Sequence, residues 1–349
     1  MKRFISGVVS FLLIPALIGV CGNFKSASAS DAADFYKGKV LEFVVPYSPG
    51  GGTDTYARLI GPYLERHTGT TVVIKNMPGA ASIYGTNAVY TAKPTGLKIQ
   101  ITDTGGIVLA QLFKQKGVRY NINKFNWLGR IDGSKRVVLV AKNSPYHNLK
   151  DLAGAKQIKF SSSGITSGPG LTFSLLAHAL GWPPGKLAQV SGYGGGRELM
   201  MAVMQGETDA TSLSHSTAAS FAKQGLVRAL ITVDKERSKY LPDVPTPYEQ
   251  VKIPKDKDWP LSVYLSLEGF RRGLITTPGV PQDRIDFLRD AVEKTLNDKE
   301  LLAKASKVKR DINPLSGKEM EKGIKESVGG LSEEQMNEFR YICFEKYYK

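Results

Sequence analysis

The chain repeats one local order several times: a short apolar run, then a turn of small residues, then a helical pattern. Strand-like runs occupy residues 39–47, 71–76 and 97–103, and helix-like segments follow at 54–66, 82–93 and 107–114. Strands that alternate with helices are typical of an α/β protein with a parallel sheet. We therefore predict a parallel α/β sheet for this part of the chain.

The same order then occurs a second time. Further strands are predicted at 136–142, 157–162, 187–193, 210–214, 227–233 and 273–278, with helices at 171–180 and 197–206. The proline-rich stretch 242–260 interrupts the order, and two helices are expected to fill much of 281–349. The length of 349 residues exceeds the usual size of one domain. We expect two α/β units with a ligand cleft between them, at the carboxyl ends of their strands.

Glycines gather where strands meet helices. In "VVPYSPGGGTDTYARL" (44–59), Gly50, Gly51 and Gly52 precede a helix that starts near Asp54, and Gly194–Gly196 precede another helix. Glycine lets the backbone approach a ligand closely, and peptide N–H groups at a helix start favour anions. The pattern predicts an anion site. It leaves open whether the protein only holds the anion or acts on it, and a simple tight turn is the alternative.

The N-terminus has the parts of a secretory signal peptide. Lys2 and Arg3 precede an apolar run from Phe4 to Val20, and Ala27-Ser28-Ala29 forms a cleavage site. We predict cleavage after Ala29 and export to the periplasm. Lipid attachment at Cys21 is the alternative, disfavoured because Val20 before it is not a small residue.

Charge and cysteine content limit the classes of partner. The formal net charge is +15, or +12 without residues 1–29, and the basic residues are spread along the chain. This distribution favours small anionic solutes over nucleic acid. Cys343 is the only cysteine after position 29, so the predicted mature chain has no internal disulfide.

Seven sequence blocks follow one another in an informative order. They are "VVPYSPGGGTDTYARLI", "VVIKNMPGAASIYGTNAV", "AKPTGLKI", "FSSSGITSGPGLTFSLLAHALG", "GYGGGRELMMAVMQGETDA", "LPDVPTPYEQ" and "GLITTPGVPQDRIDFLRDAVEKTLND". Over roughly residues 38–325, this series resembles the periplasmic receptors of tripartite tricarboxylate transporters, the Bug-type binding proteins.

The resemblance implies an α/β type II periplasmic binding protein fold. Two lobes would be joined by two crossover strands, near 136–142 and 270–278; lobe 1 would hold residues 30–137 and 272–349, and lobe 2 residues 138–271. The implied function is capture of a small carboxylate, without cofactor or metal, and delivery to the permease subunits of a tripartite tricarboxylate-type membrane transporter. Docking on a membrane sensor stays an alternative, and we expect a monomer.

The expected ligand contacts combine the resemblance with the glycine- and hydroxyl-rich loops. They are Tyr47, Ser48, Pro49, Gly50, Gly51, Asp54, Ala80, Ala81, Ser82, Ser162, Ser163, Thr166, Ser167, Gly194 and Arg197. Several of them have open alternatives: Tyr47 either stacks on the ligand body or simply packs, and the hydroxyl-rich loop of Ser162, Ser163, Thr166 and Ser167 either binds the anion or is an ordinary loop. Asp54 either caps its helix, orders the glycine loop or accepts a hydrogen bond from the ligand or its water, and Arg197 either pairs with a second carboxylate or stays exposed.

Some positions depart from the family pattern. Gly170 stands where a histidine is common, Ala81 replaces a common glycine, and Pro49 replaces a small residue. The rival class, an enzyme, is disfavoured because the chain has neither Gly-x-x-x-x-Gly-Lys-Ser/Thr nor Gly-x-Ser-x-Gly. The four histidines are far apart in sequence and show no zinc-binding spacing.

Overall fold

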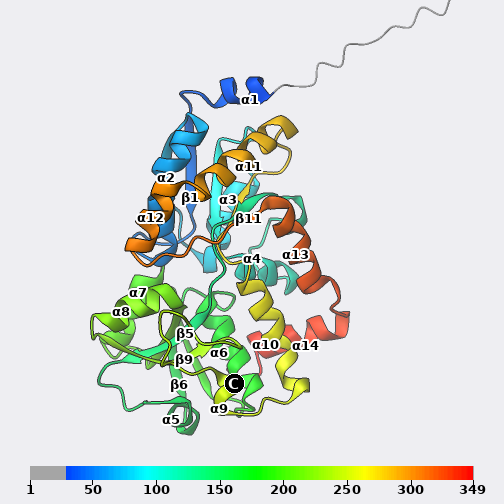
Figure 1. Ribbon diagram of the computed structural model, residues 1–349. Helices are drawn as coiled ribbons and strands as arrows, with labels where there is room; N and C mark the ends of the chain where they lie inside the picture. Colours follow the sequence, from blue (N-terminus) through cyan, green and yellow to red (C-terminus); the bar gives the residue numbers. More distant parts are fainter. Residues whose placement is uncertain (1–28, 349) are drawn as a thin grey trace, which may run out of the picture.

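The computed structural model describes residues 29–348, which form two lobes, one above the other in Figure 1. The predicted signal peptide, residues 1–29, lies outside the described residues except for Ala29, the first residue of α1 (Ala29–Tyr36). Within the described range, no helix has both the length and the apolar character needed to cross a bilayer.

Lobe 1 is built on a sheet of six strands among the described residues. Their order is β11 (Leu315–Ser316), β4 (Asn126–Arg130), β10 (Gly273–Thr276), β3 (Lys98–Thr102), β1 (Val40–Val45) and β2 (Thr71–Asn76). One face is covered by α2 (Gly52–Thr68), α11 (Gln282–Leu296) and α12 (Lys299–Lys307). The other face is covered by α3 (Ile83–Tyr90), α4 (Thr104–Leu112) and α13 (Gly317–Gly329).

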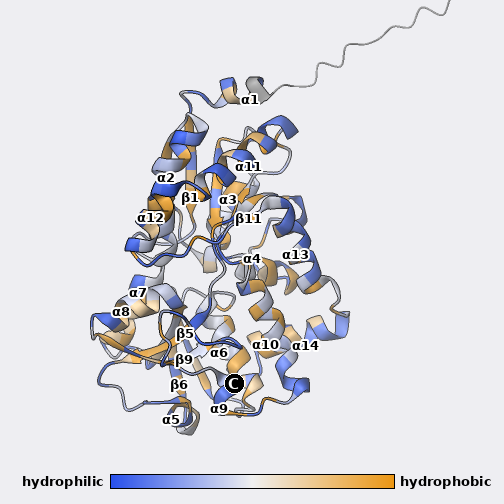
Figure 2. Cartoon of the chain, in the orientation of Figure 1, coloured by the Kyte–Doolittle hydropathy of each residue, from blue (hydrophilic) through white to orange (hydrophobic). Residues whose placement is uncertain are grey.

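Lobe 2 is built on a second sheet, of five strands within residues 29–348. Their order is β7 (Leu187–Ser191), β6 (Ile158–Ser162), β8 (Ala210–Ser214), β5 (Arg136–Ala141) and β9 (Val227–Val233). Helices α7 (Gly196–Met204) and α8 (His215–Lys223) cover one face, and α5 (Leu149–Gly154) and α6 (Gly168–Ala179) cover the other. Figure 2 shows apolar residues concentrated in strands such as β9 and hydrophilic residues on outer helices such as α13.

The prediction of a parallel sheet was only partly right, because lobe 1 contains two reversed strands, β10 and β11, and lobe 2 contains one, β5. β10 pairs antiparallel with β3 and β4, and β5 pairs antiparallel with β8 and β9. Both strands follow a crossing from the other lobe. They therefore enter their sheet at the end where the parallel strands finish, as the pairing of Gly273 with Thr102 and of Arg136 with Ser214 shows.

The two chain segments that cross between the lobes, residues 131–135 and 269–272, lie side by side. The Ile131 N–H donates to the Arg272 carbonyl oxygen at 3.0 Å, and the Ser134 N–H donates to the Glu268 carbonyl oxygen at 3.2 Å. These short paired segments leave few backbone positions at which one lobe can turn relative to the other.

Several elements were missed in the sequence. They are β4, β11, α1, α8, the short helices η1 (Ala80–Ser82), η2 (Ile122–Lys124) and α9 (Pro247–Gln250), and α10 (Lys255–Glu268), which overlaps the proline-rich stretch. Instead of two C-terminal helices, the described residues form four, α11 to α14 (Glu333–Phe344). Capping boxes at Ser316 with Glu319 and at Ser332 with Gln335 start α13 and α14, so Ser-x-x-Glu and Ser-x-x-Gln were the overlooked signals.

The C-terminal tail contacts lobe 2, although the predicted division of the chain places it in lobe 1. The rest of that division stays a prediction. Residues 272–349 were assigned to lobe 1, yet α14 packs against α6 of lobe 2, and the Leu187 N–H of β7 donates to the Tyr347 carbonyl oxygen at 3.0 Å. Cys343 of α14 is a free, buried thiol, and burial raises its pKa. The apolar cluster around α4, α6, α10, α13 and α14 is continuous, so both lobes share one core along this edge.

We expect the shared core to depend on Phe339 of α14. Its ring is fully buried and lies 5.1 Å from the Phe113 ring, while Tyr341 on the same helix is 51% exposed. Phe339→Ala should lower the free energy of unfolding by about 3–5 kcal/mol, and Tyr341→Ala by less than about 0.5 kcal/mol. Urea unfolding of both variants checks this expectation. Equal, small losses would show that the tail contributes little to the core.

Candidate functional site

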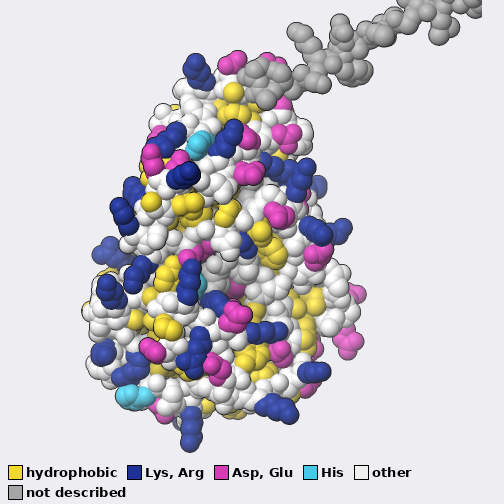
Figure 3. Space-filling model, in the orientation of Figure 1, with side chains coloured by type: hydrophobic (Ala, Val, Ile, Leu, Met, Phe, Trp, Pro, Cys, Tyr) yellow, Lys and Arg dark blue, Asp and Glu magenta, His cyan; other side chains and the backbone are white. Residues whose placement is uncertain are grey.

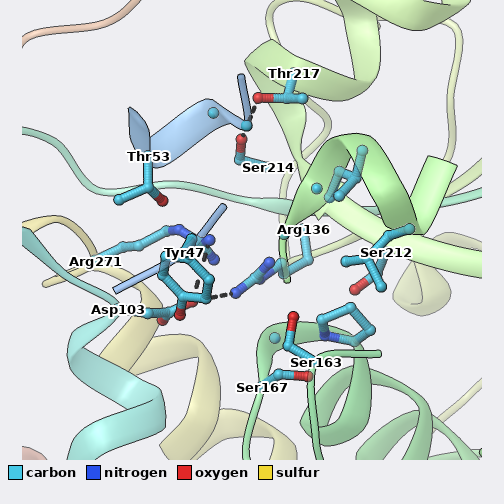
Figure 4. A pocket seen from close by; sticks show the side chains of 18 of the residues that line it. Tyr47, Thr53, Asp103, Arg136, Ser163, Ser167, Ser212, Ser214, Thr217 and Arg271 are labelled. Carbon is cyan, nitrogen blue, oxygen red and sulfur yellow. Dashed lines mark hydrogen bonds and ion pairs between the residues drawn. The ribbon is translucent and has the colours of Figure 1, made fainter. Parts of the chain in front are cut away.

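A cavity lies between the lobes and is lined by residues of both (Figure 4). Its lining consists of Tyr47, Gly51, Gly52, Thr53, Asp103, Arg136, Ser163, Ser167, Gly168, Pro169, Gly195, Gly196, Leu199, Ser212, Leu213, Ser214, Thr217, Arg271 and Arg272. We call this the inner cavity. Its volume is about 50 Å³, where one water molecule needs about 10–15 Å³ on this measure. The inner cavity therefore suits a group of a few heavy atoms.

Four helices begin at the wall of the inner cavity. Lining residues include Gly52 and Thr53 of α2, Gly168 of α6 and Gly196 of α7, and the N-cap Ser214 of α8. The first N–H groups of a helix have no partner within the helix, and this end carries a partial positive charge. Four such ends around one small space favour an anion there.

Glycine permits this close approach of helix ends. A Cβ atom at Gly52 would lie 2.6 Å from Oγ1 of Thr217 on α8. A Cβ atom at Gly168 would collide with the guanidinium group of Arg136. Any larger residue would therefore separate α2 from α8 or displace Arg136.

Arginines and acids form a buried ionic cluster at one side of the cavity, which we call the crossing network: Asp103, Arg136, Glu268 and Arg271. Nη2 of Arg136 lies 2.8 Å from Oδ2 of Asp103, and its Nε lies 3.0 Å from Oε2 of Glu268. Arg271 reaches the same two acids, at 3.1 and 2.9 Å. All four residues are less than 10% exposed, so water screens these pairs little.

A second buried pair lies beside the crossing network. Nη1 of Arg272 donates to Oδ1 of Asp132 at 2.7 Å, and the Arg272 guanidinium lies 4.2 Å from the centre of the Tyr56 ring. Together with the crossing network, this gives three arginines and three carboxylates. The charged side chains of the wall are thus balanced before any ligand binds.

The environment keeps these groups ionised. Burial acts to raise the pKa of Asp103, but Arg271, Arg136 and Arg272 outweigh it and hold that pKa below its usual value. Burial likewise disfavours the charged form of Arg136, yet Glu268 and Asp103 raise the pKa of this arginine. Within residues 29–348, no cluster of three or more His, Cys, Asp or Glu side chains is placed to hold a metal ion.

The predicted contacts fall into three groups, the first at the inner cavity. Tyr47, Gly51, Ser163 and Ser167 line it. The second group, Ser48, Ala80, Ala81, Ser82 and Gly194, lines an adjoining space that we call the outer chamber, which Tyr47 and Ser163 also line. The whole lining of the outer chamber is Pro46, Tyr47, Ser48, Pro78, Gly79, Ala80, Ala81, Ser82, Ser163, Gly192, Tyr193, Gly194 and Glu198.

The third group lines neither space. It comprises Pro49, Gly50, Asp54, Ser162, Thr166 and Arg197. The Asp54 carboxylate accepts from the Gly50 N–H at 2.8 Å and from Nδ2 of Asn76 at 2.9 Å, so Asp54 orders the glycine loop. Thr166 donates to Gln115, and Arg197 is exposed on the surface. The structure thus favours the loop-ordering alternative for Asp54 and the exposed alternative for Arg197.

Two of the positions that depart from the family pattern, Gly170 and Ala81, are constrained by the local backbone. A Cβ atom at Gly170 would collide with the Ile165 carbonyl oxygen, so this backbone excludes a histidine there. Ala80, Ala81 and Ser82 have φ angles of 47°, 53° and 82°, in the left-handed region that costs non-glycine residues about 1–3 kcal/mol each. The Ala81 N–H donates across the lobes to the Ser163 carbonyl oxygen at 3.2 Å.

The sequence analysis missed the charged wall. Asp103, Arg136, Arg271 and Arg272 line the inner cavity but were not among the predicted contacts. Their signals were present: Asp103 directly follows β3 in "LKIQITD", Arg136 begins β5 in "KRVVLV", and Arg271 and Arg272 directly precede β10 in "FRRGLI". Charged residues at the cleft end of a strand are placed to face a ligand.

The family model described as tripartite tricarboxylate transporter family receptor matches residues 56–326. The chain belongs to this family. Its members are periplasmic solute-binding receptors. The seven sequence blocks that suggested this family, over roughly residues 38–325, fall largely inside the matched range.

Individual members of the receptor family are similar in sequence and in fold. BugT of Bordetella pertussis is 23% identical over 271 residues, which cover 72% of this chain and 81% of BugT. The structure of BugD superposes with a TM-score of 0.72 at 23% identity, over 88% of this chain and 98% of BugD. MatC from Rhodopseudomonas palustris, solved with bound malate, gives 0.70 at 21% identity, over 87% and 99%. The predicted periplasmic binding protein fold is confirmed.

The crossing network should make stability depend on pH through Asp103. Its folded pKa is lowered, so its stabilising effect is present above the unfolded pKa of about 3.9 and is lost as pH falls through the lower folded value. Asp103→Asn should cost about 3–5 kcal/mol near neutral pH, because it leaves buried arginines without a partner.

Urea unfolding from neutral pH to about pH 3 checks this prediction, since the gap between the parent and Asp103→Asn should begin to narrow once the pH falls below the unfolded pKa of about 3.9. Asp243→Asn, at an exposed acid, is the matched control and should follow the parent. Parallel curves for the parent and Asp103→Asn across the whole range would contradict the role assigned to Asp103.

Proposed function

We propose that the protein is an exported receptor that captures a small organic acid, with one carboxylate held in the inner cavity. The observation that carries this proposal is the convergence of four helix starts on a space whose wall also contains Arg136 and Arg271. Each hydrogen bond from such donors to a carboxylate contributes roughly 1.5–3 kcal/mol. Membership of the receptor family and the malate found in MatC support a carboxylate ligand.

We infer that the lobes close over this ligand by bending at residues 131–135 and 269–272. Contacts between the lobes beside the cavity support closure, because the Ser48 N–H donates to the Gly194 carbonyl oxygen at 2.8 Å. Such a contact forms only when the first glycine loop and the Gly194 loop meet. The closed receptor then presents one surface made from both lobes.

The closed surface would allow the receptor to deliver its ligand to a membrane transporter. We propose that the loaded receptor, as a monomer, docks on the membrane subunits of a tripartite tricarboxylate-type transporter, which would tell the closed form from the open one. The family description supports a transporter partner. Docking on a membrane sensor would use the same closed surface and is the alternative outcome of a pull-down with membrane proteins.

A substitution in the first glycine loop should weaken ligand binding. A Cβ atom at Gly51 would lie 3.4 Å from the Gly196 amide nitrogen, so the branches of valine would crowd the starts of α2 and α7. Gly51→Val should lose about tenfold or more in affinity, the loss of one charge-assisted hydrogen bond. The measurement is calorimetry with an acid identified by a thermal-shift screen of the mature chain.

The matched control is Gly330→Val, because a Cβ atom at Gly330 meets no other atom within 4 Å. This variant should bind as the parent does. If Gly51→Val also binds like the parent, the glycine loop does not hold the ligand. If no organic acid shifts the melting temperature of the parent, the proposed function is wrong.

Export should remove the N-terminal segment. The charged start, the apolar run and Ala27-Ser28-Ala29 predict a mature protein that begins at Ser30. Mass spectrometry of protein from a periplasmic fraction measures this mass directly. An intact N-terminus, or a lipid-modified Cys21, would contradict the prediction.

A further inference from the structure

The inner cavity and the outer chamber adjoin each other between the lobes. Tyr47 of lobe 1 and Ser163 of lobe 2 line both parts. The inner cavity measures about 50 Å³ and the outer chamber about 340 Å³. A carboxylate fills a space of the smaller size, so the body of an organic acid must extend past Tyr47 and Ser163 into the outer chamber.

The two parts differ sharply in charge. Arg136, Arg271 and Arg272 line the inner cavity together with Asp103, and the starts of four helices add partial positive charge there. Among the described residues that line the outer chamber there is no Lys, Arg or His, and Glu198 is the one carboxylic acid. A ligand that reaches from one part to the other therefore meets the partial positive charge of helix starts at one end and a carboxylate at the other.

The Glu198 carboxylate is fixed in place. Its Oε2 accepts a hydrogen bond from the Gly194 N–H at 2.7 Å, and Gly194 in turn accepts from the Ser48 N–H of lobe 1. This chain of contacts ties Glu198 to the point where the lobes meet. The carboxylate cannot turn out into solvent without breaking its bond to the Gly194 loop.

Nearby cations do not offset Glu198 inside the chamber. Arg197 is exposed and lies beside Gly50, where a Cβ atom would be 3.6 Å from its Cδ. Arg58 is paired with Asp54 at 2.9 Å. A second ligand carboxylate in the outer chamber would therefore lack a cationic partner and would face a like charge, which disfavours its binding.

We propose that the ligand is an organic acid with a single carboxylate, held in the inner cavity, and a far end in the outer chamber that carries no negative charge. Tyr47, Pro46 and Pro78 offer this end apolar surface, and the Ser48 and Ser163 loops offer polar groups. This inference rests on the proposed function and narrows its ligand from organic acids in general to those with one negative charge.

The experiment compares ligands matched in size but not in charge. Calorimetry on the mature protein would use linear monocarboxylates beside the dicarboxylates of equal chain length, and benzoate beside terephthalate. We expect the monocarboxylate of the best pair to bind at least about tenfold more tightly. A dicarboxylate that binds as tightly as its partner, or more tightly, overturns the inference but leaves the proposed function standing. Failure of every acid overturns both.

A variant tests the cause of the discrimination. Glu198→Gln keeps an acceptor for the Gly194 N–H and removes the negative charge, so the ratio of monocarboxylate to dicarboxylate affinity should fall about tenfold. Glu338→Gln, at an exposed position of α14 outside both spaces, removes the same charge elsewhere and should keep the parental ratio. An unchanged ratio in Glu198→Gln would show that Glu198 does not exclude the second carboxylate.

Discussion

The bond between Arg136 and Asp103 joins the two lobes at the wall of the ligand cavity. Arg136 begins β5, the first strand of lobe 2, and Asp103 directly follows β3 of lobe 1, so the pair connects the start of a strand in one sheet to the end of a strand in the other. Arg136 also lies at the start of α6, where the helix dipole disfavours a cation. Asp103 and Glu268 are therefore required to keep that arginine buried.

The cavity takes its character from this balance. Because three buried arginines are already neutralised by three buried acids, the added affinity for an anion comes largely from backbone N–H groups at helix starts. Glycines at these starts bring the donors close together, as the contact between Gly52 and Thr217 shows. On the visible face of the described residues, positive side chains are also spread out. In Figure 3, Lys and Arg are scattered over this face among acids and do not gather into one patch.

Much of the fold could be predicted from the sequence because hydrophobic runs and glycine junctions are local signals. Nine of the predicted strands are present with shifts of a residue or two at most positions, from β1 at Val40–Val45 to β10 at Gly273–Thr276. Strand direction was not predictable in this way. β5 and β10 are reversed because the chain crosses between lobes just before them, which no local pattern within 136–142 or 273–278 reveals.

The site was only partly predictable for a related reason. Glycine- and hydroxyl-rich loops such as Gly50–Gly52 and Ser162–Ser167 indicate an anion by their composition. Each arginine of the wall has an acidic partner far away in the chain, 33 positions for Arg136 with Asp103 and 140 for Arg272 with Asp132, and these partners come together only through the fold. For Asp54 the local sequence was misleading. Its place after the glycines suggested a ligand contact, but in the folded loop its carboxylate accepts a hydrogen bond from the Gly50 N–H.

The tail has a consequence for the order in which the molecule can be assembled. Phe339, Cys343 and Tyr347 complete the core that α6 and β7 share with lobe 1, and they are synthesised well after α6 and β7 because they come later in the chain. Until they emerge, the apolar face of α6 has no cover from α14. A nascent chain therefore cannot complete this core until α14 has been synthesised, and a chain that has not finished folding is the form that a secretion channel can thread.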